Sequence, residues 1–205
     1  MGARWVVATA NPHKVAELAA LFAGLDVTLV AKPPEVTMPE ETGTTFLANA
    51  RLKARAVAAA TGEVALADDS GLEVDALGGD PGVLSARYAG VDGAGADAAN
   101  NAKLLAELAG IHGPNRRARF RCVLALVAPD GREVTAEGRI EGFVLDAPRG
   151  QGGFGYDPLF LPEADNAAAR SFAEYAPAEK NAVSHRGRAA ERLREALTRL
   201  GRLVP

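Results

Sequence analysis

The sequence has little cysteine and no long apolar run. It contains one cysteine in 205 residues, so no disulfide can form within the chain. No hydrophobic stretch approaches the ~20 residues that a membrane-spanning helix requires. The chain opens on a predicted strand instead of a basic segment followed by an apolar one. We therefore expect no secretory signal, no membrane association and a cytoplasmic protein.

An excess of charge of one sign is also lacking. Lys and Arg number 23 and Asp and Glu number 26, which gives a net charge of −3. A protein that grips nucleic acid by its phosphates is normally much more basic, so we expect no nucleic-acid partner. A small anionic ligand needs only a few local cations. No Gly-Lys-Ser or Gly-Lys-Thr occurs, which excludes a P-loop.

The residues that are present suit a folded α/β protein. Hydrophobic residues make up 48% and charged residues 24%, as in ordinary globular proteins, and the length fits one domain or two small lobes. Cys122 lies in the apolar run 120–127, where a buried and unreactive thiol is expected, with a catalytic thiol as the alternative. Hydrophobic periodicity and turn signals predict strands at 4–9, 27–30, 64–67, 119–127, 133–139 and 142–145, and helices at 12–22, 44–61, 97–109 and 177–200.

Two acidic pairs could supply oxygen ligands to a magnesium ion. Asp68-Asp69 follows the predicted strand 64–67, at the edge of an α/β sheet where ligands usually bind. Glu40-Glu41 lies in a proline-rich loop. Successive residues in extended chain point to opposite sides, so one member of each pair should face the metal. A solvated turn is the alternative for Asp68-Asp69, and simple exposure is the alternative for Glu40-Glu41.

Two cationic segments could bind phosphate. Residues 9–14 connect a strand to a helix, so backbone N–H groups at the helix start could converge on phosphate oxygens together with Lys14. An ordinary helix cap is the alternative. Lys180 and His185 lie five residues apart, about 140° around a helix, so their shared use requires a bent or broken helix, which Gly187 would allow. Lys53 is another possible phosphate contact, although a surface lysine is the safer expectation.

The segment 150–155 matches the G-x-G-x-x-G dinucleotide fingerprint only formally. That motif requires a helix beginning at its third glycine. Here Tyr156-Asp157-Pro158 follows at once, and Pro158 disfavours helical geometry at Asp157. We therefore expect no nicotinamide or flavin site.

Six blocks together resemble a known family. They are ATANPHK at 8–14, EETG at 40–43, ADDSGL at 67–72, GGDPG at 78–82 with SARY at 85–88, GFGYDP at 153–158 and SHRG at 184–187. In order and spacing this set is similar to the inosine triphosphate pyrophosphatase family, whose bacterial members are called XTP/dITP diphosphatases. The resemblance spans nearly the whole chain.

The resemblance implies one domain over residues 1–205, with an α/β fold of two lobes around a long mixed sheet and a central nucleotide-binding cleft. It also implies a homodimer and a magnesium-dependent hydrolase. That enzyme would cleanse the nucleotide pool by converting ITP, dITP and XTP to the monophosphate and pyrophosphate. Alternatives are a pyrophosphatase for modified pyrimidine nucleotides, a phosphatase releasing single phosphates, and a non-catalytic nucleotide-binding module.

The resemblance also implies roles for individual residues. Asp69 looks like the catalytic general base and a metal ligand; Glu40 looks like a second ligand, although the adjacent Glu41 is not separated from it. Substrate contacts are implied for Thr9, Ala10, Asn11, Pro12, His13, Lys14, Ser70 and Lys180, and a base pocket for Phe154, Gly155, Tyr156, Asp157, His185 and Arg186. Donors there could bind the 6-keto oxygen of hypoxanthine or xanthine, where adenine presents an amino donor instead.

Overall fold

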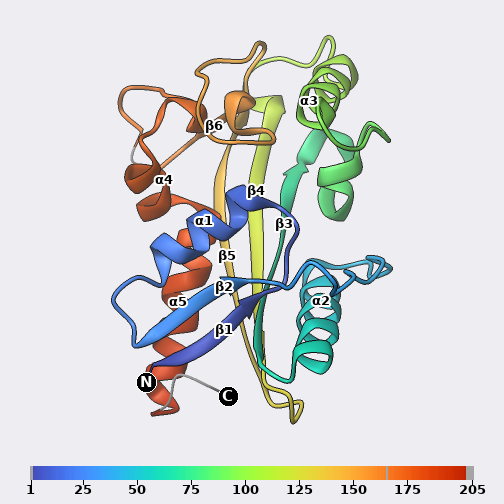
Figure 1. The fold of residues 1–205 in the computed structure, drawn as a ribbon. Helices are drawn as coiled ribbons and strands as arrows, with labels where there is room; N and C mark the ends of the chain where they lie inside the picture. Colours follow the sequence, from blue (N-terminus) through green and yellow to red (C-terminus); the bar gives the residue numbers. More distant parts are fainter. Residues whose placement is uncertain (1, 165, 202–205) are drawn as a thin grey trace. The chain divides into compact units, whose positions relative to one another are not determined.

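The computed structural model describes residues 2–164 and 166–201 and forms a six-stranded sheet of order β2-β1-β3-β4-β5-β6 (Figure 1). Strand β1 (Ala3–Val7) runs parallel to β2 (Val27–Ala31) and to β3 (Val64–Val74). Strand β5 (Glu133–Val144) runs antiparallel to β6 (Phe160–Pro162). The predicted α/β class with a mixed sheet is confirmed.

The chain divides into two compact units. Among the described residues, unit 1 comprises 2–69, 122–138 and 186–201, and unit 2 comprises 70–121, 139–164 and 166–185. Strands β3, β4 (Arg117–Val127) and β5 each contribute residues to both units.

Unit 1 carries helices α1 (Pro12–Leu21), α2 (Phe46–Thr61) and most of α5 (His185–Arg199). Alternate residues of β1 share a core with α1 and α5, which includes Trp5, Val7, Leu18, Phe22, Leu66, Leu193 and Leu197. Helix α2 begins after Thr45, whose Oγ1 accepts from the Ala48 N–H at 3.1 Å, and ends at Gly62 with φ of +67°. Both ends fall where the sequence predicts them.

Unit 2 carries α3 (Ala96–Glu107) and α4 (Pro177–Val183), with short 3₁₀ turns between the strands. Its core is rich in aromatic rings. The Phe120 ring lies 4.7 Å from the Phe160 ring and 6.1 Å from the Phe172 ring, measured between centroids. Buried Leu104 and Leu108 from the α3 region join the same cluster. Helix α3 is therefore fixed by packing at its C-terminal end.

Four predicted elements differ from the structure. Strand β3 continues through the acidic pair to Val74 instead of ending at residue 67. Residues 133–144 form one strand instead of two, and Gly142 of this strand lies so close to β6 that a Cβ would meet the Leu161 carbonyl. The predicted C-terminal helix is broken at Ser184, whose ψ of 163° is extended. The sequence favoured a break at Gly187, and the observed break lies three residues before that glycine.

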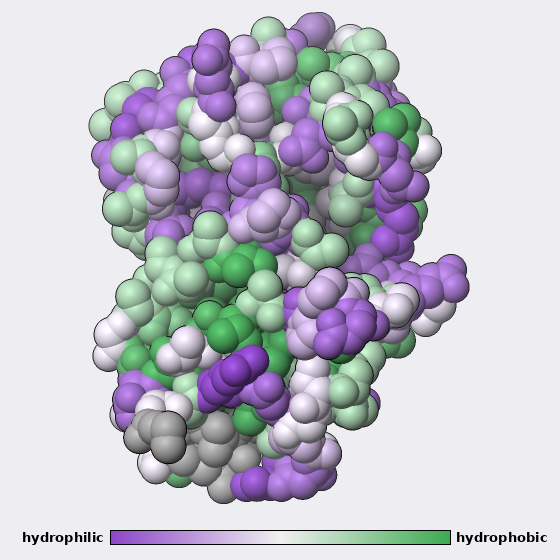
Figure 2. Space-filling model, in the orientation of Figure 1, coloured by the Kyte–Doolittle hydropathy of each residue, from purple (hydrophilic) through white to green (hydrophobic). Residues whose placement is uncertain are grey.

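The surface of the protein carries both hydrophilic and hydrophobic side chains. Figure 2 shows hydrophilic and hydrophobic residues interspersed on the visible face. Leu84, Val91 and Leu200 are the large hydrophobic side chains found exposed among the described residues. Within residues 2–164 and 166–201, no helix has the length and apolar character needed to cross a membrane.

Candidate active site

The acidic pair lies in β3 just beyond the end of its neighbour β1. The last paired residue of β1 is Val7, which is opposite Leu66, and the Ala8 N–H donates to the Leu66 carbonyl at 2.8 Å. Past that point β3 has no β1 backbone beside it, although β3 itself continues. The prediction of a strand end is wrong, but the pair does lie beyond the carboxyl end of the adjacent parallel strand.

The two aspartates point to opposite faces of β3, as strand geometry requires. Asp68 contacts Lys14 of α1 and Arg186 of α5, whereas Asp69 contacts Lys53 of α2. Each carboxylate therefore has a different set of partners. Asp69 faces the α2 side, and Asp68 is enclosed by α1 and α5.

Asp69 shares a lysine with Glu41. The Lys53 ammonium lies 2.5 Å from Asp69 Oδ1 and 2.7 Å from Glu41 Oε1, and Lys53 is only 6% exposed. Burial raises the pKa of Asp69 above its ordinary value, against the opposing charge of Lys53. Burial lowers the pKa of Lys53, but the two carboxylates outweigh it and raise that pKa overall. Asp69 is thus a buried carboxylate with increased basicity.

The second oxygen of Asp69 is available to a ligand. Asp69 Oδ2 is buried and has no hydrogen-bond partner within the described part of the chain. Among the described residues, no group of three His, Cys, Asp or Glu side chains is arranged so that it could hold a metal ion by itself. Magnesium is usually held by one or two carboxylates together with waters and substrate phosphates, so Asp69 and Glu41 fit such an ion. Glu40 is exposed, whereas Glu41 shares Lys53 with Asp69. Glu41 is therefore better placed than Glu40 to hold a metal together with Asp69.

Asp68 is the centre of a buried charged cluster. Its carboxylate lies 2.6 Å from Lys14 Nζ and 2.8 Å from Arg186 Nε, and it accepts from the Cys122 thiol at 3.1 Å. Arg186 also donates to Glu17. Burial would raise the pKa of Asp68, but the Arg186 and Lys14 charges hold it well below its ordinary value. Asp68 therefore stays ionised and fixes the Lys14 ammonium.

Cys122 is fully buried, as the sequence predicts. Burial raises the pKa of its thiol, and the neighbouring Asp68 carboxylate raises it further. A thiol held in its protonated form is a poor nucleophile. Its position in the Asp68 cluster therefore fits a hydrogen-bond donor better than a catalytic group.

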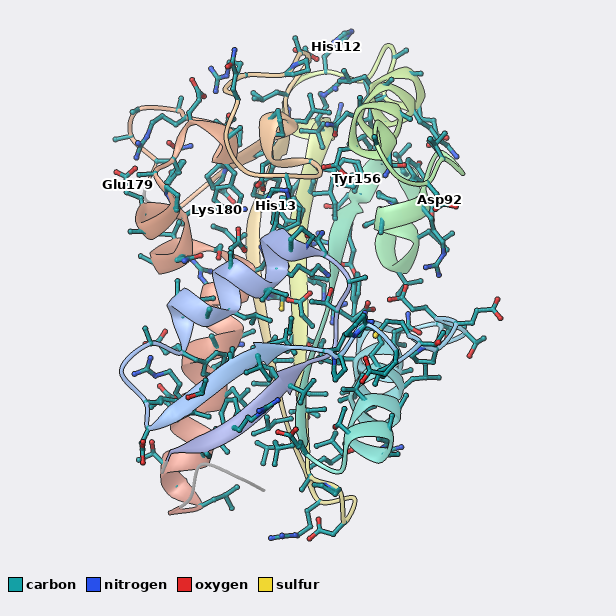
Figure 3. The ribbon with its side chains drawn as sticks, viewed as in Figure 1. His13, Asp92, His112, Tyr156, Glu179 and Lys180 are labelled. Carbon is teal, nitrogen blue, oxygen red and sulfur yellow. The ribbon has the colours of Figure 1, made fainter. Side chains whose placement is uncertain are left out.

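The loop from Thr9 to Lys14 forms a capped helix start. The Asn11 side chain accepts from the N–H groups of His13 at 2.9 Å and Lys14 at 3.4 Å, and the Asn11 N–H donates to Thr9 Oγ1 at 3.1 Å. Pro12 is the first helical residue, and Ala10 and His13 are exposed. His13 is labelled in Figure 3. The Asn11 side chain thus occupies two of the backbone N–H groups that were expected to face phosphate. The Lys14 side chain is then the main group of this loop that could bind phosphate.

In unit 2, the segment from Phe154 to Asp157 is tied to Lys180. Asp157 Oδ2 accepts from the Phe154 N–H at 2.9 Å and from the Lys180 ammonium at 2.6 Å, and that ammonium lies 4.8 Å from the Phe154 ring centroid. The carboxylate passes so close to Gly153 that a Cβ would clash with it. Lys180 is 4% exposed, so it supports the aromatic segment directly.

Other predicted base-pocket residues have defined partners. The Tyr156 hydroxyl donates to the Ser85 carbonyl at 2.9 Å, and the His185 ring stacks on Phe120 at 4.7 Å. Arg186 is only 1% exposed and donates to Asp68 and Glu17 in unit 1. Ser70 is half-buried in β3. The structure thus groups Phe154, Tyr156, Asp157, Lys180 and His185 within unit 2, whereas Arg186 belongs to the Asp68 cluster.

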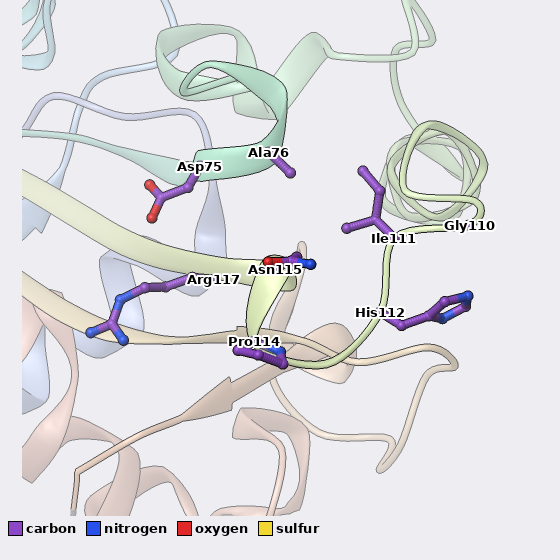
Figure 4. Close-up of a pocket in the computed structure, with 8 residues that line it drawn as sticks. All are labelled: Asp75, Ala76, Gly110, Ile111, His112, Pro114, Asn115 and Arg117. Atoms are coloured by element: carbon purple, nitrogen blue, oxygen red, sulfur yellow. The ribbon is translucent and has the colours of Figure 1, made fainter.

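Two further features of unit 2 concern the glycine-rich segment and a surface pocket. The glycine-rich segment leads into a 3₁₀ turn, Asp157–Leu159, and not into a helix, which agrees with the rejection of a dinucleotide fingerprint. A separate surface pocket in unit 2 is shown in Figure 4. It is lined by Asp75, Ala76, Gly110, Ile111, His112, Pro114, Asn115 and Arg117, none of which is a predicted site residue.

Lys53 is the residue that the sequence reasoning underrated. A surface lysine was expected, yet Lys53 is buried beside Asp69. A signal was present in the spacing. Phe46, Ala50 and Val57 recur at helical intervals and are buried, and Lys53 falls on the same stripe. A lysine within an apolar helix face requires a buried acidic partner.

Comparisons with known proteins place this architecture in a defined class. A HAM1 protein from Coxiella burnetii has a solved structure that matches with a TM-score of 0.84 at 42% identity, covering 96% of this chain and 99% of that one. A dITP/XTP pyrophosphatase from Nitratidesulfovibrio vulgaris is 58% identical, over 93% of each chain. A second, from Desulforamulus reducens, is 52% identical over 95% of this chain and 96% of its own.

The Ham1 family model matches residues 5–196, and the chain belongs to the Ham1 family. The two relatives that are 58% and 52% identical to this chain both carry the name dITP/XTP pyrophosphatase. The family resemblance inferred from the six sequence blocks is therefore confirmed.

Proposed function

We propose that this protein hydrolyses non-standard purine nucleoside triphosphates, namely dITP, XTP and ITP, to the monophosphate and pyrophosphate. The observation that carries the proposal is the buried Asp69 carboxylate, which has one oxygen on Lys53 and the other without a partner in the described structure. The name shared by relatives at 52% and 58% identity supports the same activity. Such an enzyme would remove unwanted nucleotides from the precursor pool.

The residues divide into two chemical groups. In unit 1, Lys14 and Lys53 supply positive charge for the triphosphate, and Asp69 and Glu41 supply carboxylate oxygens. In unit 2, the Phe154 ring offers an aromatic face for a purine, held by Asp157 and Lys180. In this proposal, discrimination against adenine requires a hydrogen-bond donor at the 6-keto oxygen, such as His185 or a backbone N–H group, since adenine presents a donor at that position.

A divalent metal fits the carboxylates of Asp69 and Glu41. Hard oxygen donors suit Mg²⁺, and the buried Asp69 Oδ2 provides a direction for a ligand. When bound, the ion would neutralise phosphate charge during the displacement. Lys53 keeps the two carboxylates together when they would otherwise repel each other.

Asp69 acts as the general base in this proposal. A water molecule adds its oxygen to the α-phosphorus, the bond from that phosphorus to the bridging oxygen breaks, and pyrophosphate leaves. Asp69 accepts the proton that the water loses. Burial raises the pKa of Asp69 in the protein without a metal, which favours proton acceptance by this carboxylate. Lys14, fixed by Asp68, stabilises negative charge on the departing group.

We also propose that the protein works in the cytoplasm as a homodimer. The family resemblance motivates the dimer, and the net charge of −3 and the lack of a long apolar run are consistent with that compartment.

A nucleotide panel tests the function directly. With Mg²⁺ present, dITP, XTP and ITP should each yield one pyrophosphate per monophosphate, at kcat/KM values far above those for ATP and dATP. Pyrophosphate and orthophosphate are measured separately in the same samples. Orthophosphate as the first product would contradict the proposed cleavage site, and turnover of ATP equal to that of ITP would contradict the base preference.

A pair of glutamine variants identifies the second metal ligand. We expect Glu41→Gln to raise the Mg²⁺ concentration for half-maximal rate about ten- to a hundredfold, since losing a direct ligand should cost at least as much as losing an outer-shell partner. Glu40→Gln is the matched control and should leave that concentration within about twofold, because Glu40 is exposed. The reverse result would assign the ligand to Glu40.

A further inference from the structure

Helix α3 holds Gly155 of the aromatic segment from both sides. Asp97 Oδ2 accepts from the Gly155 N–H at 2.7 Å, and Asn101 Nδ2 donates to the Gly155 carbonyl at 3.0 Å. Asp97 and Asn101 are four residues apart, so they lie on the same face of the helix. The two bonds fix the peptide groups before and after the Gly155 Cα. All of these residues belong to unit 2.

Gly155 is a point at which the segment needs support. Its φ of +60° is in the left-handed region, which a glycine adopts as readily as other conformations. A residue with that freedom does not by itself keep one backbone geometry. Asp157 anchors the Phe154 N–H on one side, and the α3 side chains restrict the next peptide groups. The orientation of the Phe154 ring therefore depends on two independent anchors.

The helix that provides these bonds is itself rigidly seated. Asn100 is 2% exposed; its Oδ1 accepts from the Ala89 N–H at 2.7 Å, and its Nδ2 donates to the Ser85 carbonyl at 3.3 Å. The Ser85 carbonyl also accepts from the Tyr156 hydroxyl. Asn100 thus ties α3 to the turn that also holds Tyr156. Asp97 and Asn101 project from a fixed helix.

We propose that Asp97 and Asn101 are positioning residues for base recognition, which hold Gly155 so that the Phe154 ring is presented in one orientation. This inference rests on the proposed function, because it concerns how the purine is bound. Neither side chain needs to touch the substrate. The bond from Asp97 is assisted by its charge and is the stronger of the two.

The test uses the full chain and variants that differ in what they offer Gly155. Asp97→Ala should raise KM for XTP about tenfold, the loss expected from one hydrogen bond to a charged group, and Asn101→Ala should raise it about two- to fivefold, as for a neutral hydrogen bond, while kcat changes less than twofold. Asp97→Asn keeps an acceptor oxygen and should restore most of the affinity. The double alanine variant should raise KM by less than the product of the single effects, because both side chains hold the same glycine.

Two controls separate positioning from general destabilisation. Inorganic tripolyphosphate has no base, so its inhibition constant as a competitor should be unchanged in every variant. Asp92→Ala removes an exposed acid just before α3 and should leave KM within about twofold (Figure 3). Midpoints of thermal unfolding are measured for each protein.

The outcomes distinguish this inference from the proposed function. Unchanged KM for XTP in active Asp97→Ala and Asn101→Ala enzymes would overturn the inference alone. An equal rise in KM for XTP and in the inhibition constant of tripolyphosphate would also overturn it, because the effect would not concern the base. Absence of XTP turnover by the wild-type chain would overturn the proposed function and this inference with it.

Discussion

Asp69→Asn should lower kcat for XTP by about 10² to 10⁴-fold, the range that general-base catalysis supplies. The amide cannot accept the proton from water, and it is a weaker metal ligand than a carboxylate. The fold should be retained because the shapes are nearly equal and Glu41 still neutralises Lys53. Initial rates of pyrophosphate release at saturating nucleotide and Mg²⁺ measure the effect.

The control for Asp69→Asn is the same change at an exposed position. Asp92→Asn should leave kcat within about twofold, since Asp92 is exposed in the loop before α3. Circular dichroism and the unfolding midpoint check that both variants are folded. Near-normal turnover by folded Asp69→Asn would remove Asp69 from the role of general base.

Arg186→Met should lower the free energy of unfolding by about 3–5 kcal/mol, one of the largest single-residue effects that the structure predicts. Arg186 is 1% exposed and contacts Asp68, which is also 1% exposed. Methionine can fill much of the space but supplies no charge, so the buried Asp68 and the half-buried Glu17 would keep their negative charge with less compensation. Urea titration followed by circular dichroism measures the loss.

A surface arginine provides the matched comparison. Arg199 lies in the last turn of α5, where it is 73% exposed and 3.9 Å from Glu195. Arg199→Met should change the free energy of unfolding by about 0.5 kcal/mol or less, as is usual for exposed ion pairs. Equal losses in the two variants would show that the Asp68 cluster contributes little to stability.

Local sequence predicts the helix ends and the chemistry of the acidic pair well. Thr45 and Gly62 bound α2 as their side-chain and backbone preferences require. The opposite orientations of Asp68 and Asp69 follow from strand geometry alone. The end of β3 could not be predicted in the same way. Two adjacent aspartates suggest a turn, but here ion pairs with distant lysines and an arginine make the extended conformation favourable.

The sequence alone could not predict which residues pair with Arg186 and Lys53. Arg186 follows His185 directly, so a shared role at the base was a natural expectation from the resemblance. The structure instead pairs Arg186 with Asp68, 118 residues earlier in the chain. Lys53 reaches Asp69 across 16 residues. Such pairings depend on which elements pack together, and residue spacing along one element does not contain that information.

The alternation of Asp68 and Asp69 also constrains how this chain can change during evolution. One residue holds the buried cluster and the next carries the proposed chemistry, and only their positions along β3 separate the two tasks. Inserting or deleting one residue between Val64 and Asp68 would exchange the faces of both side chains. A single substitution in this part of the strand changes one side chain and leaves the others on their faces. A change of length would remove both the ion cluster and the general base at once. We therefore expect the length of this stretch to be more strictly preserved than its composition.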